Sequence, residues 1–239
     1  MNLHLLNRKR VHIISMNKAI GKLHLWRSIS PALPIGAYAY SQGLEFACDQ
    51  GWVHNTDSAH DWIAGIMSHT MAKLDIPLLV RLIGAWQRQD QSQIYYWNQL
   101  LLASRESQEL RNEDEHLGSA FTRIIKEENI QLWDLWQQTE KPCYATVYAL
   151  FIAHWQIELV EACCGYIWSW CENQVGAAIK LIPLGQTAGQ QILYKLINLI
   201  PTAVEMGLQL SDDEIGVILP GMGISSALHE TQYTRLFRS

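Results

Sequence analysis

The residues whose spacing could support nucleotide or hydrolase chemistry lie in a few short motifs, and each motif is incomplete. Gly221 and Gly223 form a GxG, but no strand is expected before it and a third glycine is missing, so it does not match a dinucleotide-binding loop. The segment PLGQTAGQ, residues 183–190, lacks the Lys-Ser or Lys-Thr of a phosphate-binding loop. No serine stands in a GxSxG motif. We therefore expect the chain not to bind GTP itself.

The residue spacing also gives no support for a metal site or for acid–base catalysis. His54, His60 and His69 have no partner one helical turn away among themselves, and the five cysteines include no CxxC pair. Glu158 and Glu161 could project together from a helix like a catalytic acid and base, but no companion histidine or metal motif accompanies them. We predict no catalytic residues, no cofactor and no metal site, and hence a protein that is not an enzyme.

Composition narrows the class of protein. The 239 residues are 49% hydrophobic and only 17% charged, below the usual ~25%, which favours a large core or a buried partner surface. The net charge of -5 argues against nucleic-acid binding. The longest uncharged run in the apolar middle, Pro142–Ile157, is too short and too polar to span a bilayer. With five cysteines and no secretory signal, we expect reduced thiols in a cytoplasmic protein without membrane contact.

The elements that must position any site are predicted to be helices. Apolar residues at three-and-four spacing predict helices over 60–74, 76–87 and 94–104, with Thr56 or Asp57 as the first N-cap and Pro77 in the first turn of the second. No alternating run with hairpin turns predicts a strand. The sequence therefore predicts an all-α, single-domain helical bundle with no significant β-sheet.

Three regions follow from the pattern. Residues 1–21 are predicted to be a disordered N-terminal extension, with Met1 or Met16 as the start, and residues 22–210 to be the helical domain. Within it, residues 143–210 carry only six charges, which indicates helices enclosed on every side or a contact between two copies in a homodimer. Residues 211–239 carry no core-sized apolar face, so we expect this segment to order on a partner.

The charged segment 104–128 is predicted to be a solvated helix face. Arg105 and Glu109 lie four apart, close enough on a helix to interact, although such a pair contributes only a few tenths of a kcal/mol.

Four segments resemble the urease accessory protein UreF family. They are SPALPIGAYAYSQGLE (30–45) and residues 103–121, 177–193 and 229–239, and they occur in family order. The resemblance implies an all-α cytoplasmic protein that dimerises, binds the accessory protein called UreD or UreH, and recruits the GTPase UreG. This assembly delivers nickel to apo-urease. The resemblance implies a scaffold. The alternatives are an activator of UreG, with Arg105, Arg111, Arg235 or Arg238 as an arginine finger, and a nickel metallochaperone.

Partner-binding residues are predicted in three places. In the first segment, Pro31 and Pro34 stiffen the turn and Gly36 permits close backbone approach. We expect Tyr38 and Tyr40 to pack into the bundle, with part of the turn near a partner. In segment 229–239, a helical turn would place Tyr233, Leu236 and Phe237 on one side, flanked by two arginines. We expect this segment to be mobile until UreD or UreH binds. The candidate residues are Pro34, Gly36, Tyr38, Arg105, Glu109, Arg111, Tyr233, Arg235, Leu236, Phe237 and Arg238.

Overall fold

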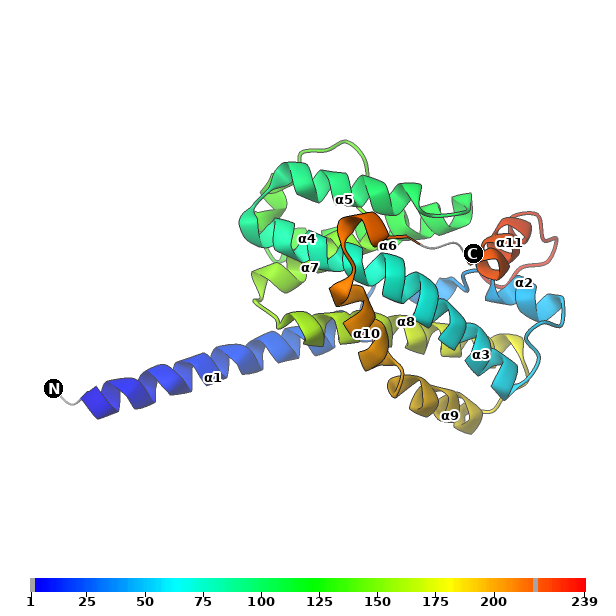
Figure 1. Ribbon diagram of the computed structural model, residues 1–239, viewed down its shortest axis with the longest axis horizontal. Coiled ribbons are helices and arrows are strands. Elements are labelled where there is room, and N and C mark those ends of the chain that lie inside the picture. The colour runs from blue at the N-terminus through cyan, green and yellow to red at the C-terminus, as the bar shows by residue number, and fades with distance from the viewer. Residues whose placement is uncertain (1–2, 217–218) are drawn as a thin grey trace.

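A continuous helix of 33 residues, Thr56–Arg88, crosses the protein (Figure 1). In the computed structural model it consists of α3 (Thr56–Ile66), η2 (Met67–Asp75) and α4 (Ile76–Arg88), and η2 is a π-helix. The two helices predicted over 60–74 and 76–87 thus join into one, with Pro77 in the first turn of α4 directly after the π-helix. The N-cap is Asn55, which forms a capping box with Ser58, so the prediction of Thr56 or Asp57 as the cap is wrong.

The structure describes residues 3–216 and 219–239, and the side chains of α1 from residue 16 onward. No strand occurs among these residues, so the prediction of a single all-α domain is confirmed. The remaining elements are α1 (Leu3–Ser28), η1 (Ala37–Ala39), α2 (Leu44–Asp49), α5 (Gln91–Ala103), α6 (Gln108–Glu127), η3 (Gln131–Leu135), α7 (Tyr144–His154), α8 (Leu159–Leu181), α9 (Gln186–Ile197), α10 (Ile200–Gln209), η4 (Asp212–Glu214) and α11 (Pro220–His229).

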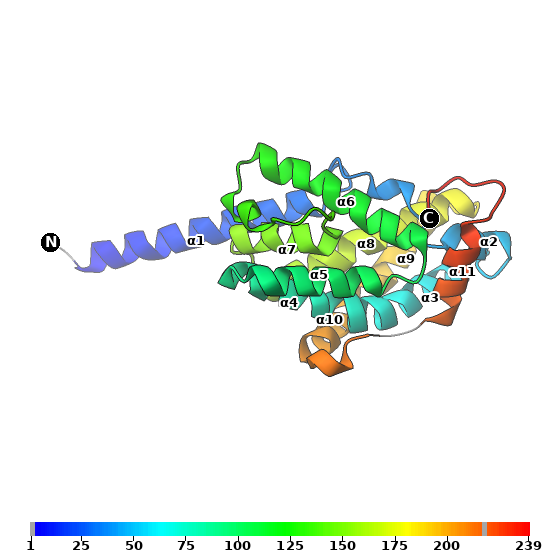
Figure 2. The ribbon, with the colours of Figure 1, turned by 90° about the horizontal axis from the view of Figure 1, so that it is seen from above.

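The most enclosed helix is α7, which packs between α4 and α6 (Figure 2). Every side chain from 145 to 153 is buried. Trp86 of α4 donates from Nε1 to the carbonyl of Thr146 at 2.9 Å, which satisfies the indole at the centre of the core. The apolar character of this segment therefore reflects burial within one chain, as the sequence pattern predicted for enclosed helices.

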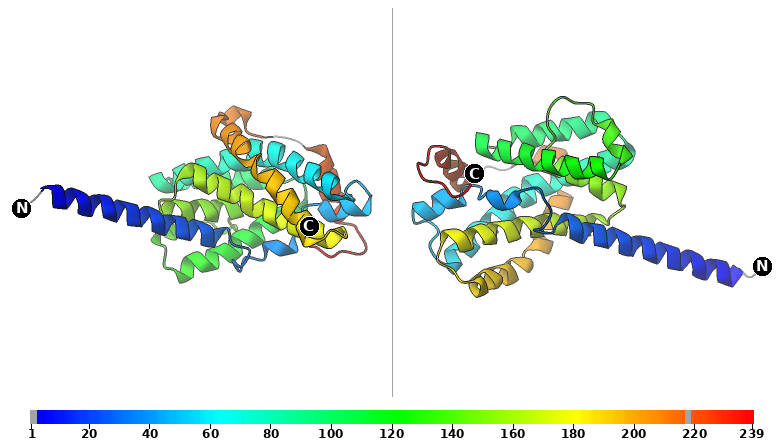
Figure 3. Two further views of the ribbon diagram at one scale, coloured as in Figure 1. Left: turned by 90° about the horizontal axis from the view of Figure 1, so that it is seen from below. Right: turned by 180° about the vertical axis from the view of Figure 1, so that it is seen from behind.

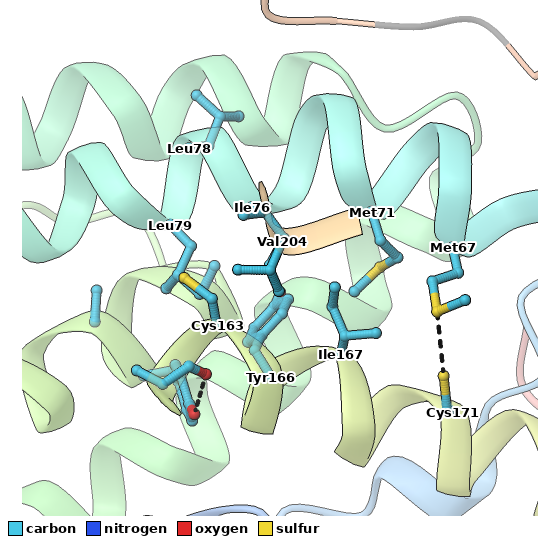
Figure 4. Packing of buried hydrophobic residues seen from close by; sticks show 14 of the residues in the cluster. Met67, Met71, Ile76, Leu78, Leu79, Cys163, Tyr166, Ile167, Cys171 and Val204 are labelled. Carbon is cyan, nitrogen blue, oxygen red and sulfur yellow. Dashed lines mark hydrogen bonds between the residues drawn. The ribbon is translucent and has the colours of Figure 1, made fainter. Parts of the chain in front are cut away.

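Sulfur-containing and branched side chains fill the seam between the long helix and α8 (Figure 4). Met67 of η2 lies 3.9 Å from the thiol of Cys171. Burial raises the pKa of Cys163 and of Cys171 to about 12, so these thiols pack as neutral apolar groups. All five cysteines are free in the structure, and Cys48 and Cys164 are only partly buried.

The long helix is also apolar enough, by length and composition alone, to cross a membrane. In the structure 61% of its most apolar window is buried inside the protein, as in the core helix of a soluble protein.

Helix α1 projects from the rest of the molecule (Figures 1 and 3). Its C-terminal turns pack on α8 and on the loop before it, where a Cβ at Gly21 would lie 3.2 Å from the carbonyl oxygen of Trp155. The predicted boundary between residues 21 and 22 therefore falls inside a helix. Disorder of residues 1–21 in solution and the choice between Met1 and Met16 stay predictions.

Candidate functional site

The turn after α1 is rigid but presents its aromatic residue to solvent. Gly36 has a φ of 80°, a left-handed conformation that favours glycine. Pro34 is exposed, and Tyr38 is 69% exposed. Tyr40 is buried, and its hydroxyl lies 3.1 Å from Nδ1 of His116. The expectation that both tyrosines pack into the bundle is therefore right for Tyr40 and wrong for Tyr38, because η1 turns the Tyr38 ring outward.

The C-terminal segment packs against its own chain around Glu45 of α2. The Glu45 carboxylate accepts hydrogen bonds from the backbone N–H groups of Leu236 and Phe237 at 2.6 and 2.9 Å. Its Oε2 also lies 3.1 Å from Nε2 of His229, which is fully buried. The segment thus has contacts within its own chain, and its mobility in the free protein and its ordering on a partner stay predictions.

Glu109 closes the same cluster from the first turn of α6. Its Oε2 lies 2.6 Å from Nδ1 of His229, and its Oε1 accepts from Arg235 at 2.6 Å. Each imidazole nitrogen of His229 therefore faces a carboxylate. The predicted pairing of Glu109 with Arg105 is wrong, since Glu109 holds the tail instead.

The last residues do not form the predicted helical turn. Residues 230–239 are turns and bends, and Phe237 is 6% exposed while Tyr233 is fully exposed and Leu236 is 64% exposed. The three apolar side chains therefore do not share one side. A bent chain separates them, because the backbone N–H groups of Leu236 and Phe237 bond to Glu45 and not to a helical ladder.

The turn and the tail meet at one surface. The backbone N–H of Arg238 donates to the carbonyl of Ala39 at 2.9 Å. The ammonium of Lys180 lies 6.0 Å from the ring centroid of Tyr38 and 5.5 Å from that of Phe237, within the range of cation–π contacts. We call the exposed residues Pro34, Tyr38, Tyr233, Arg235, Leu236 and Arg238 the tail–turn surface.

Arg105 lies beneath this surface rather than on it. It precedes α6, and its guanidinium contacts the carboxylates of Asp75 at 2.7 Å and Asp114 at 2.5 Å. Burial opposes its charge, but the two carboxylates raise its pKa well above the ordinary value. The prediction of a solvated helix face is wrong at this end of the segment, where Glu113 and Asp114 are also buried. Arg111 is exposed, and its Nε donates to the Arg105 carbonyl at 3.3 Å.

Sequence reasoning missed the residues that hold the site together. Glu45, His229 and Lys180 lie within three of the family-like segments, but nothing in those segments indicates their roles, because their partners lie far away in the chain. For example, 184 positions separate Glu45 from His229. In the part of the chain that the structure describes, no group of three or more His, Cys, Asp or Glu side chains is arranged to hold a metal ion.

The fold and the site define an all-helical protein that presents aromatic and arginine side chains on one surface, the residue types enriched in protein-binding surfaces. Comparison with known protein families shows that the UreF family model matches residues 53–197. The chain belongs to the UreF family of urease accessory proteins.

Relatives cover nearly the whole chain. It is 48% identical over 223 residues to the urease accessory protein UreF of Alkalilimnicola ehrlichii, covering 93% of this chain and 98% of the relative. It is 44% identical to the protein of the same description from Hahella chejuensis, covering 91% and 97%. A third, from Teredinibacter turnerae, is 43% identical, covering 91% and 98%. These relatives are described as accessory proteins and not as enzymes. The family predicted from the four sequence segments is confirmed.

Proposed function

We propose that this protein is a non-catalytic cytoplasmic scaffold of urease maturation. In this role it joins the accessory protein UreD or UreH and the GTPase UreG, and the assembly inserts nickel into apo-urease. Membership of the UreF family supports the place in urease maturation. The single observation that supports a scaffold is the tail–turn surface, where exposed aromatic and arginine side chains stand on a segment held by the contacts of Glu109 with His229 and Arg235.

UreD or UreH is proposed to bind at this surface. Tyr233 is fully exposed and Leu236 largely so, although the backbone beside them is held by Glu45. A pre-positioned aromatic side chain loses little entropy on binding. Arg235 and Arg238 at the edge would donate charge-assisted hydrogen bonds to acidic groups of the partner.

The test compares binding of purified UreD or UreH to the native chain and to a Tyr233→Ala, Leu236→Ala double variant. A hot spot contributes about 2 kcal/mol or more, so the double variant should bind about 30-fold more weakly and support less urease activation. Tyr96→Ala is the matched control, since Tyr96 is 54% exposed on α5. Unchanged binding in the double variant would refute this surface.

A homodimer is also proposed, with its contact in the region 143–210. The exposed apolar residues of this region support it: Val160, Tyr194, Ile197, Leu199 and Met206. Most of these lie on α9, α10 and the turn between them. Obligate dimer interfaces resemble a section through a domain core.

Of the candidate arginine fingers, Arg105 is the weakest, because both sides of its guanidinium already contact carboxylates. Single-turnover GTP hydrolysis by UreG, measured with and without this protein, separates a scaffold from an activator. We expect no acceleration.

A further inference from the structure

A cavity of about 90 Å³ lies beneath the turn that follows α1. Its walls come from the turn, from η2, from the start of α6 and from α8. The volume is several times the ~10–15 Å³ that suffices for one water molecule. Aromatic side chains form much of the lining: Tyr38, Tyr40, Tyr144, Tyr166 and Trp170.

The charges around this cavity are unbalanced. Three carboxylates line it, those of Asp75, Glu113 and Asp114, and Arg105 is the one basic side chain among the described lining residues. Both Asp75 and Asp114 contact Arg105. Three ionised carboxylates and one guanidinium would leave an excess of two negative charges. Buried charges are costly unless they are paired or neutralised by a proton, so a bound cation would stabilise the charged form of this cavity.

Among the residues that the structure describes, Glu113 is the one of these three carboxylates that forms no ion pair. It accepts hydrogen bonds from Nε2 of Gln42 and from the hydroxyl of Ser239, both at 2.9 Å and both from neutral donors. Burial raises its pKa to about 7, so near neutral pH it changes between a proton-bearing and a charged form.

An unpaired acceptor lines the same cavity. Within the described part of the chain, the side-chain oxygen of Gln174 on α8 has no hydrogen-bond partner, although Gln174 is only 2% exposed. A buried amide oxygen without a donor costs about 1–3 kcal/mol. A ligand that both carries positive charge and donates hydrogen bonds would satisfy this oxygen and Glu113 together.

The backbone around the cavity is also unusual. Asp75 is the last residue of the π-helix η2, and such segments frequently occur at functional sites. Gln42 has a φ of 54°, which is uncommon for a residue with a side chain. Its amide contacts Glu113 and also accepts from Nε1 of Trp170 at 2.8 Å. These costs are tolerated where the surrounding structure fixes a site.

We propose that this cavity binds the guanidinium or primary ammonium group of an organic cation. Aromatic walls attract such groups through cation–π contacts, Glu113 supplies the opposite charge, and the Gln174 oxygen accepts a hydrogen bond. Two sources carry this chemistry, a free small molecule and an arginine or lysine side chain of a partner protein. The proposal does not depend on the scaffold role, because the pure chain is sufficient to test it.

The test measures binding of ethylguanidinium and n-propylammonium to the purified full chain by calorimetry, with their near-isosteric neutral counterparts ethylurea and 1-propanol as controls. Sodium chloride keeps the ionic strength constant. We expect each cation to bind at millimolar concentrations and at least tenfold more tightly than its neutral counterpart. Equal binding of cation and neutral counterpart, or no binding at 50 mM, would overturn the proposal.

Two variants locate the site. Glu113→Gln and Gln174→Leu should each weaken cation binding tenfold or more, while Glu115→Gln should leave it unchanged. Glu115 lies on the same helix but pairs with Lys141 at the surface. Circular dichroism establishes that each variant is folded, and cation binding equal to that of the native chain in both cavity variants refutes the assignment.

The source is distinguished by adding purified UreD or UreH to the chain loaded with n-propylammonium. Release of the probe assigns the cavity to a partner side chain, whereas retention of the probe in the complex assigns it to a free cation.

Discussion

Replacing Glu45 by alanine should release the C-terminal tail. The Glu45 carboxylate accepts from the N–H groups of Leu236 and Phe237 and faces Nε2 of His229. Hydrogen bonds to a charged group contribute about 1.5–3 kcal/mol each. They act as a unit, because a tail that detaches regains hydration at both backbone N–H groups together. We therefore expect Glu45→Ala to lower the free energy of unfolding by about 3 kcal/mol. This figure includes the lost burial of Phe237, which is 6% exposed in the native chain.

For a chain of this length 1 kcal/mol corresponds to about 2–4 °C in Tm, so Glu45→Ala should melt about 6–12 °C lower at pH 7. The control is Asp49→Ala, which removes an exposed carboxylate from the same helix. Differential scanning calorimetry measures the shift.

Limited trypsin digestion gives an independent readout. Arg235 contacts Glu109, and the backbone N–H of Arg238 bonds to Ala39, so a held tail is protected and a released tail is cleaved at both arginines. Faster cleavage in Glu45→Ala than in Asp49→Ala is expected. If the two variants melt within 1 °C of each other and are cleaved at the same rate, Glu45 does not hold the tail and the reasoning fails.

Three further outcomes follow from buried charge and exposed apolar surface. Because burial raises the pKa of Glu113 to about 7, its contribution to stability is present below about pH 4.5 and is lost as the pH rises to about 7. The free energy of unfolding of Glu113→Gln should therefore rise by roughly 2–3 kcal/mol relative to that of the native chain between pH 4.5 and 7.5. Equal pH dependence of the two chains in urea titrations would contradict this. Arg105→Ala should cost about 3–5 kcal/mol because it leaves Asp75 and Asp114 unpaired, and a loss below 1 kcal/mol in the same titrations would contradict it. Tyr194→Glu should shift the chain from dimer to monomer in light scattering, since Tyr194 is 74% exposed on α9, whereas an unchanged mass would remove α9 from the contact.

The sequence predicted the fold well because helix formation depends on neighbours in the chain. The positions of apolar residues located α4 and α5, and the low charge of residues 143–210 predicted enclosed helices, of which α7 is one. The same local patterns were less accurate at helix ends. The N-cap is Asn55 and not Thr56 or Asp57, because the helix begins earlier than the apolar pattern indicates.

The polar contacts of the site were not predictable in the same way, since each joins residues far apart in the chain. Arg105 and Glu109 satisfy the spacing rule for a helical pair, yet Arg105 lies before the helix and contacts Asp75, 30 positions away. Glu109 contacts Arg235, 126 positions away. An exposed ion pair on a helix contributes only a few tenths of a kcal/mol. Leaving the buried carboxylates of Asp75 and Asp114 without a cation would cost more, so Arg105 pairs with them and not with Glu109. The composition of segment 104–128 thus indicates a solvated helix face, but the segment supplies buried contacts instead. Arg105 pairs with Asp75 and Asp114 at the cavity, and Glu109 contacts His229 and Arg235 of the tail.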